Sequence, residues 1–290
     1  MNAAVGRDLE LGAEDGRRLA ATLYTAAQPN GIAVLINSAT ATPRQYYRAF
    51  ATFLAARGFV VLTYDYRGFG GSLDGPLRRE KVRLLDWGQL DQAAATAFLR
   101  NHFPDRALVI VGHSVGGQLL GLSRYAGDVR AALLVGSAHG YWRKWPRAIE
   151  RYRKWFTWQV VGRTLIPLFG YMPGWIRGRK DIPGGVARDT MRFTLSPHFF
   201  CDDQGRPLRP FNDDIRVPVR LIALSDDAVA PPAAVIDLDS YYPKAIHRVD
   251  HFTPAHYGVQ SVGHFGFFRR SMPQSAWIDA ADWLSAHAQA

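Results

Sequence analysis

A serine, an aspartate and a histidine occupy three short segments that together could carry out nucleophilic catalysis. Ser114 lies in GHSVG (residues 112–116), a G-x-S-x-G pattern, Asp227 lies in LSDDAVAPP, and His264 lies in SVGHFGFF. A serine hydroxyl is a poor nucleophile without a base, and the base needs a carboxylate to orient it. The order serine, acid, histidine is the one expected where a strand-to-helix turn carries the nucleophile. These residues therefore predict acyl transfer through Ser114.

Each of the three residues also has a plainer interpretation. A glycine-rich turn can bind a phosphate or serve only as a turn, and a G-x-S-x-G match occurs by chance in about one chain in ten of this length. An aspartate in a loop often caps a helix or forms a turn, and a lone histidine is usually structural. Catalysis is favoured because the apolar run ALVIVG enters the serine turn directly and a helical pattern leaves it directly.

Two of the positions have close competitors. Asp226 precedes Asp227, but the D-x-x-A-P spacing places Asp227 one step into the loop, so Asp227 is preferred. His251 and His256 compete with His264. We expect His251 on a strand and His256 in the middle of a loop, and no third ligand is evident that would make them a metal pair. His264 follows the last strand, where flanking glycines predict an exposed and mobile loop.

The chain alternates expected strands with expected helices. The strands are expected at 17–24, 31–37, 59–65, 107–112, 129–138, 217–225 and 244–252. The helices are expected at 43–58, 84–102, 115–126, from about 231, and at 273–288. This alternation predicts an α/β fold with a mostly parallel central sheet and helices on both faces. Residues 139–205 interrupt it and are interpreted as a helical cap inserted into a core formed by 1–138 and 206–290.

Four segments together resemble the α/β-hydrolase superfamily. They are the strand–GHSVGG–helix turn, LSDDAVAPP, VGHFGFF and the loop YDYRGFGGS. More narrowly, the chain is similar to the hydrolases near the serine aminopeptidase and monoacylglycerol lipase-like group, from about residue 17 to 288 apart from the insertion. The resemblance implies an α/β-hydrolase fold in which Ser114 attacks, His264 is the base and Asp227 orients it. It implies a structural role for the D-x-R-G-x-G-x-S loop.

Two backbone N–H groups would have to stabilise an oxyanion. The N–H of Val115, at a helix N-terminus, is expected to point into the site. Superfamily members often carry His-Gly after the third strand, but this chain has Asn37 and Ser38 there, and Ala39 would supply the second N–H. Asn37 could instead lend its side-chain amide, and Asn37 and Ser38 are also candidate substrate contacts. His113 is expected to be a packing residue whose ring points away from the nucleophile.

Residues 141–200 carry most of the net charge of +10. They hold twelve Lys or Arg residues and three acids, together with five of the eight tryptophans. Three interpretations stay open: a helical cap with a solvated basic face, a lid that covers a lipophilic substrate and touches an anionic membrane surface, and a nucleic-acid-binding segment. Nucleic acid is not expected, because the segment is inserted into an enzyme-like core. Trp142, Trp145 and Trp155 are candidate substrate contacts.

Composition bears on the compartment in which the protein is expected and on the disulfides and metal sites that it could contain. The single cysteine, Cys201, excludes an internal disulfide and a multi-cysteine metal site, and it fits a reducing compartment. The N-terminus has no signal pattern, and no apolar run reaches the roughly 18 residues of a membrane span. We therefore expect a cytoplasmic protein, and the pattern implies no metal and no cofactor.

The leading hypothesis is a serine hydrolase that cleaves carboxylic esters with an apolar acyl or aromatic part. An N-terminal peptidase or amidase of the same fold is an alternative, and it would need carboxylates near the site to hold the substrate ammonium. A non-catalytic, membrane-associated binding protein is a third hypothesis. The replacement of His-Gly by Asn37 and Ser38 is the feature that favours it.

Overall fold

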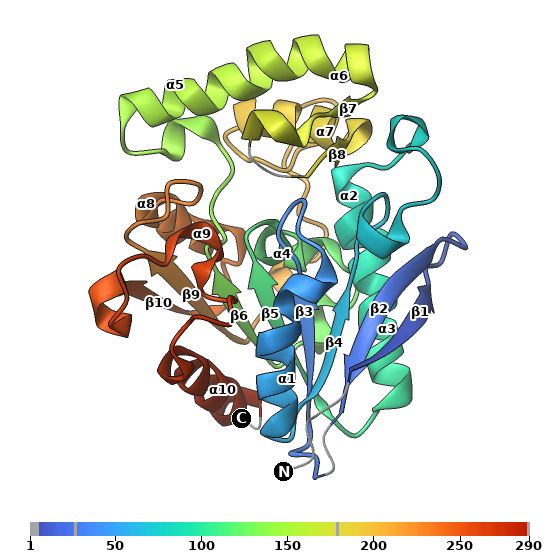
Figure 1. The fold of residues 1–290 in the computed structure, drawn as a ribbon, viewed down its shortest axis with the longest axis vertical. Helices are drawn as coiled ribbons and strands as arrows, with labels where there is room; N and C mark the ends of the chain where they lie inside the picture. The colour runs from blue at the N-terminus through green and yellow to red at the C-terminus, as the bar shows by residue number, and fades with distance from the viewer. Residues whose placement is uncertain (1–5, 26–27, 178–179, 289–290) are drawn as a thin grey trace.

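The computed structural model describes residues 6–25, 28–177 and 180–288. An eight-stranded sheet of order β1-β2-β4-β3-β5-β6-β9-β10 forms the centre of the molecule (Figure 1). Its strands are β1 (Gly6–Gly12), β2 (Arg18–Tyr24), β3 (Ile32–Asn37), β4 (Val60–Tyr64), β5 (Ala107–His113), β6 (Ala131–Val135), β9 (Pro218–Leu224) and β10 (Ile246–Phe252). β1 and β2 pair antiparallel with their neighbours, and the other six strands run parallel. The predicted mostly parallel sheet is confirmed.

Helices and a small two-stranded sheet make up the rest of the structure. The α-helices are α1 (Arg48–Ala56), α2 (Leu84–Asp86), α3 (Ala93–His102), α4 (Val115–Gln118), α5 (Ala148–Phe156), α6 (Arg163–Phe169), α7 (Gly184–Leu195), α8 (Pro232–Ile236), α9 (Gly263–Gly266) and α10 (Gln274–Ala288). β7 (Tyr171–Met172) pairs with β8 (Ile182–Pro183). π-helical turns at Trp87–Gln92 and Thr157–Gly162 join α2 to α3 and α5 to α6. No helix of the described chain is both long enough and apolar enough to cross a bilayer.

The near-continuous apolar strands follow from burial on both faces of the sheet. Successive side chains of a strand point to opposite faces. In β3, Val34 and Ile36 belong to the cluster that includes α1 and α10, whereas Ala33 and Leu35 belong to the cluster that includes α3 and α4. Both faces of a parallel strand are therefore covered, so its sequence shows no alternation of polar and apolar residues.

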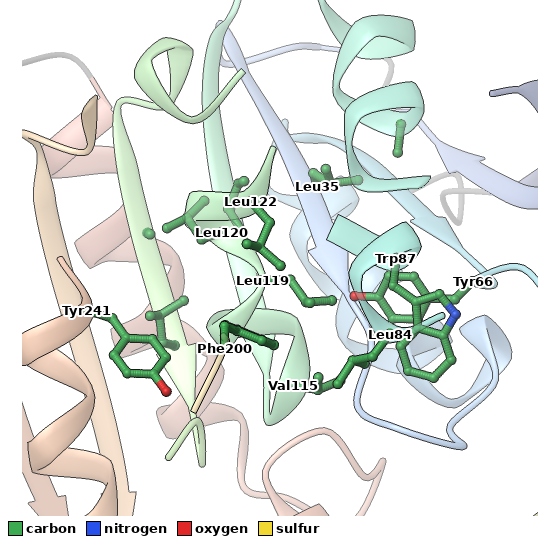
Figure 2. Close-up of a cluster of buried hydrophobic side chains, with 14 of the residues drawn as sticks. Leu35, Tyr66, Leu84, Trp87, Val115, Leu119, Leu120, Leu122, Phe200 and Tyr241 are labelled. Carbon is green, nitrogen blue, oxygen red and sulfur yellow. The ribbon is translucent and has the colours of Figure 1, made fainter. Parts of the chain in front are cut away.

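The packing behind the serine turn is dense and aromatic. Val115 and Leu84 lie close together, beside Tyr66 and Trp87 (Figure 2). The rings of Tyr66 and Trp87 are stacked, with centroids 4.7 Å apart. The start of α4 therefore rests on buried side chains, which hold the residue before it in place.

A helical cap lies above the carboxyl ends of the parallel strands (Figure 1). The rod made by α5 and α6 lies outermost, with α7 between it and the sheet. Asp189 of α7 receives hydrogen bonds from the Arg83 guanidinium and from the Leu84 N–H at 2.9 Å, which tie the cap to α2. The chain between β6 and β9 contributes no described strand to the large sheet. The exact bounds of the insertion, 139–205, stay a prediction.

Some elements of the structure differ from those expected from the sequence. The helix expected at 115–126 is only the four-residue α4, followed by 3-10 turns. Gly121 explains part of this, because a Cβ there would lie 2.3 Å from Asn212 Oδ1, so the chain is closely packed where a regular helix was expected. The antiparallel edge strand β1 has no counterpart among the expected strands. Its residues are mostly exposed, and only Leu9 and Leu11 alternate with polar residues, so the sequence signal for it is short.

Candidate active site

Ser114 lies at a sharp, strained turn between β5 and α4. Its backbone is at φ 55°, ψ −119°, a conformation that is costly for a residue with a side chain. The turn depends on glycines on both sides of it. A Cβ on Gly116 would lie 2.3 Å from the Asn37 carbonyl oxygen, and one on Gly117 would lie 2.3 Å from Ser137 Oγ. The glycines therefore permit α4 to approach the strands closely, as a nucleophile elbow requires.

His264 and Asp227 form a close buried pair. His264 Nδ1 lies 2.7 Å from Asp227 Oδ2, and both side chains are almost fully buried. The other carboxylate oxygen, Oδ1, accepts hydrogen bonds from the N–H groups of Val229 and Ala230 at 2.8 Å. His264 lies in the single turn α9 and is only 7% exposed, so the expected exposed loop is wrong for the histidine itself. Packing against the sheet holds the ring where Asp227 can orient it.

Ser114 and His264 line one cavity of about 500 Å³ beneath the cap. Val115 and Thr40 line the same cavity, as does Gly136 at the end of β6. A larger hollow of about 720 Å³ lies at the amino ends of β3 and β5, and none of these residues lines it. The chemistry-bearing side chains thus converge at the carboxyl edge of the sheet.

The two adjacent aspartates have different contacts. Asp227 bonds to His264, whereas Asp226 Oδ2 accepts hydrogen bonds from the N–H groups of Val262 and Gly263 and from the Ser261 hydroxyl. Burial alone would raise the pKa of Asp226, but these donors outweigh it and hold the pKa below its ordinary value. Asp226 therefore anchors the segment that leads into the histidine.

Gly136 was not among the candidate residues, yet the hydrogen-bonded pair of Asp227 and His264 packs directly against it. Its φ is +56°, and a Cβ would lie 3.2 Å from Asp227 Oδ2 and 3.3 Å from His264 Nδ1. Any side chain here would crowd the hydrogen bond between them. A glycine near the end of the strand expected at 129–138 was the available sequence signal, but a glycine at a strand end is too common to indicate a site.

His113 links the histidine segment to the loop after β3. Its Nε2 lies 2.8 Å from the His264 carbonyl oxygen, and its Nδ1 lies 2.8 Å from Tyr47 Oη. A carbonyl only accepts, so this contact assigns the proton to Nε2 and leaves Nδ1 to accept from the tyrosine hydroxyl. Burial raises the pKa of Tyr47 well above 10, so the hydroxyl keeps its proton. His113 therefore bonds to the histidine segment as well as packing against it.

The assignment of the Ala39 N–H to the oxyanion site needs correction. That N–H donates to Tyr47 Oη at 2.8 Å and is therefore engaged inside the protein. The next residue, Thr40, lines the cavity beside Ser114 and Val115. Within the described ranges, the N–H groups of Thr40 and Val115 have no hydrogen-bond acceptor. Thr40 and Val115 are thus the candidate donors to an oxyanion.

Asn37 and Ser38 are not substrate contacts in this structure, which corrects that expectation. Asn37 is fully buried; its Oδ1 accepts from the Tyr64 hydroxyl at 2.8 Å and its Nδ2 donates to the Gly116 carbonyl at 3.4 Å. Ser38 is 1% exposed and donates to the Tyr64 carbonyl oxygen. Neither lines the cavity. Their polar groups instead join β3, β4 and the start of α4.

Of the three tryptophans expected to contact substrate, Trp145 lines the cavity. Trp142 packs against Tyr152, with ring centroids 5.9 Å apart, and neither Trp142 nor Trp155 lines the cavity, so these two expectations are wrong for this structure. Trp158, which was not predicted, lines it. Other lining residues of this helix, among them Glu150, Lys154 and Thr157, share regular helical spacing with Trp158, so Trp155 lies on a different face of the helix.

The remaining histidine candidates lie outside this cavity. His251 is exposed on β10, and His256 stacks on Phe252 with centroids 4.4 Å apart. Within the part of the chain that the structure describes, no three His, Cys, Asp or Glu side chains are grouped so that they could hold a metal ion.

The parallel sheet, the strained serine after β5 and the histidine–aspartate pair define a serine hydrolase of the α/β fold. Residues 22–192 match the family described as serine aminopeptidase, S33, and the chain belongs to this family. No curated protein matches the chain by sequence.

Several solved structures share the fold at low sequence identity. The esterase Pf2001 of Pyrococcus furiosus is 15% identical, with a TM-score of 0.61 over 98% of this chain and 92% of that one. DcsB, solved with its substrate analogue, is 15% identical, with a TM-score of 0.64 over 98% and 99%. The acylaminoacyl peptidase of Pyrococcus horikoshii is 14% identical, with a TM-score of 0.59 over 99% of this chain and 41% of that one. The fold is thus similar to that of both esterases and peptidases.

Proposed function

We propose that the protein hydrolyses carboxylic esters with an apolar acyl or aromatic part, through an acyl-enzyme on Ser114. The observation that carries the proposal is the 2.7 Å contact of His264 Nδ1 with Asp227 Oδ2 in a cavity that also holds the strained Ser114. Aromatic side chains, among them Trp145 and Trp158, form part of the cavity wall and favour apolar substituents.

The reaction would proceed in two halves. His264 Nε2 accepts the Ser114 proton as Oγ attacks the ester carbonyl carbon, and the N–H groups of Val115 and Thr40 stabilise the oxyanion. The imidazolium then protonates the leaving alkoxide, and the acyl group stays on the serine. Water, deprotonated by His264, attacks the acyl-enzyme, and the imidazolium returns the proton to Ser114 Oγ as the bond from Oγ to the acyl carbon breaks, which releases the carboxylic acid and regenerates the free hydroxyl. Throughout, Asp227 holds the imidazole and stabilises its protonated form.

The charge of the cavity wall favours an ester over a peptide with a free amino end. Recognition of a substrate ammonium would need uncompensated carboxylates near the nucleophile. Among the described residues that line the cavity, the one carboxylate is that of Glu150, and its Oε1 lies 3.7 Å from Arg147 Nη1. Arg153 and Lys154 lie on the same wall. An N-terminal peptidase or amidase is the weaker candidate on this ground.

A panel of substrates tests the proposal. p-Nitrophenyl esters of increasing acyl length are compared with aminoacyl anilides, using the wild type and Ser114→Ala. We expect ester turnover by the wild type, little turnover of anilides, and loss of ester turnover in the variant. Equal rates for the two proteins, or faster cleavage of anilides, would overturn it.

We also propose that the outer face of the cap contacts anionic membrane. Ile149, Tyr152 and Phe156 recur at helical spacing on α5 and are 69%, 62% and 53% exposed. The exposed Arg147 and Arg163 lie on the same rod, and this combination is typical of helices that lie in the membrane interface. Sedimentation with phosphatidylglycerol vesicles should decrease in Phe156→Ser. Unchanged sedimentation, or dimerisation through this face in place of vesicle binding, would contradict the proposal.

A further inference from the structure

The cavity holds a lysine that the proposed chemistry does not use. Lys154, on α5, lines the cavity that contains Ser114 and His264. Its Nζ lies 3.1 Å from the centroid of the Trp145 ring, and Trp145 is only 4% exposed. A lysine on a cap helix would ordinarily extend its ammonium group into water. Here the group is held instead against an aromatic wall of the active site.

This ammonium group has no anionic partner within the described ranges. No carboxylate of the described residues lies within ion-pair distance of Lys154 Nζ, and no hydrogen bond from it to another residue is present. Lys144 of the same cap provides a contrast, because its Nζ reaches Asp237 at 3.1 Å. Burial lowers the pKa of Lys154 well below its ordinary value of 10.5. A bound anion would offset this cost, since opposite charges favour the charged form.

The neighbouring charges leave this wall positive. Glu150 is the carboxylate nearest along α5, and Arg147 already faces it at 3.7 Å. Arg153 also lines the cavity and has no carboxylate partner within the described ranges. Burial and the Lys144 charge lower the pKa of His139 to about 4, so at neutral pH this residue adds no charge. An anion is therefore the complementary ligand.

We propose that Lys154 binds a carboxylate borne by the ester substrate, at the end remote from the scissile bond. This inference rests on the proposed esterase function and narrows its substrate to monoesters of dicarboxylic acids. The Lys154 ammonium group, which has no carboxylate partner among the described residues, is matched by the single negative charge of a carboxylate. Trp158 and Phe199 line the cavity and would contact the methylene chain between the two carboxyl groups.

The test is a ratio of specificity constants. Mono-p-nitrophenyl esters of adipic, pimelic and suberic acids are each compared with the neutral p-nitrophenyl ester of equal chain length. In the wild type we expect at least one acid ester to have the higher kcat/KM. In Lys154→Met the ratio of acid to neutral ester should fall about 10- to 100-fold, the range for a lost hydrogen bond to a charged group. Lys154→Arg should keep most of the preference.

Control experiments distinguish a failure of the carboxylate site from a failure of the proposed esterase function. Arg188→Met removes an exposed cap cation outside the cavity lining and should leave the ratio unchanged. Calorimetry of adipate binding to the wild type and to Lys154→Met requires no turnover, and we expect the variant to bind at least tenfold more weakly. If no ester is cleaved but adipate binding depends on Lys154, the esterase proposal fails and the carboxylate site stands. An unchanged ratio, or equal adipate affinity in both proteins, overturns the carboxylate site.

Discussion

Asp227→Asn is the substitution whose effect on kcat can be predicted in most detail from the structure. Asp227 uses one oxygen for His264 and the other for two backbone N–H groups, those of Val229 and Ala230. An asparagine must keep its single carbonyl oxygen toward these two donors. Its NH₂ group then faces His264 Nδ1 and requires that nitrogen to accept. The proton is consequently placed on Nε2, the atom that must take the proton of Ser114.

The expected loss is large because the tautomer, and not the packing, is wrong. The corresponding substitution in serine proteases lowers kcat by about 10⁴, which corresponds to about 5.5 kcal/mol of transition-state stabilisation. We expect a similar loss here, measured as kcat for a short-chain p-nitrophenyl ester. Circular dichroism and urea unfolding should show that the fold is kept, since both side chains have the same shape.

Asp226→Asn is the matched control for this experiment. It changes the neighbouring carboxylate, which accepts from residues 261–263 and does not touch the His264 ring. Its effect on kcat should be far smaller than that of Asp227→Asn. If Asp227→Asn keeps kcat within about tenfold of the wild type, or if the two variants lose equal activity, the assignment of Asp227 is refuted.

Three further outcomes follow from the same contacts. Gly136→Ala should lower both stability and kcat, because φ +56° costs an alanine about 1–2 kcal/mol and its Cβ would crowd the buried pair; unchanged thermal stability would contradict this. Tyr47→Phe should lower the free energy of unfolding in urea by about 2–4 kcal/mol, because it leaves a backbone N–H and an imidazole nitrogen buried without partners; a loss below the error of the titration would refute it. The lowered pKa of Asp226 adds stability that is present above about pH 4 and is lost as the pH falls through the folded-state value. The stability difference between the wild type and Asp226→Asn should therefore shrink in acid, and a pH-independent difference would count against it.

The sequence indicates the residues that meet at the candidate site better than it indicates their surroundings. Ser114 and Asp227 each follow an apolar strand, and His264 could be chosen because it lies between the last strand and the last helix, in the expected order along the chain. The second oxyanion donor could not be assigned correctly, because the hydroxyl of Tyr47 engages the N–H of Ala39. That contact depends on how the 3-10 turn Arg44–Tyr47 folds back on the loop, which local sequence does not reveal.

The cap side chains that line the cavity could not be predicted from the sequence either, for a different reason. Its composition indicated a basic, aromatic helical segment, but the inward residues were chosen on regular helical spacing. Helical spacing does not say which face of a helix points inward, and the face that carries Glu150, Lys154 and Trp158, not the one that carries Trp155, lines the cavity. Likewise, only the folded chain shows that Lys154 lies against Trp145. The cap side chains that line the cavity depend on the folded chain more than the position of Ser114 does.

The most direct test of the central claim is the covalent modification of Ser114 by a fluorophosphonate probe. Intact-mass measurement after reaction should show one adduct per chain, and peptide mapping should place it on the segment that contains residues 112–116. Ser114→Ala should remain unlabelled under the same conditions. An unmodified wild-type protein, or equal labelling of Ser114→Ala, would contradict a nucleophilic serine at this turn.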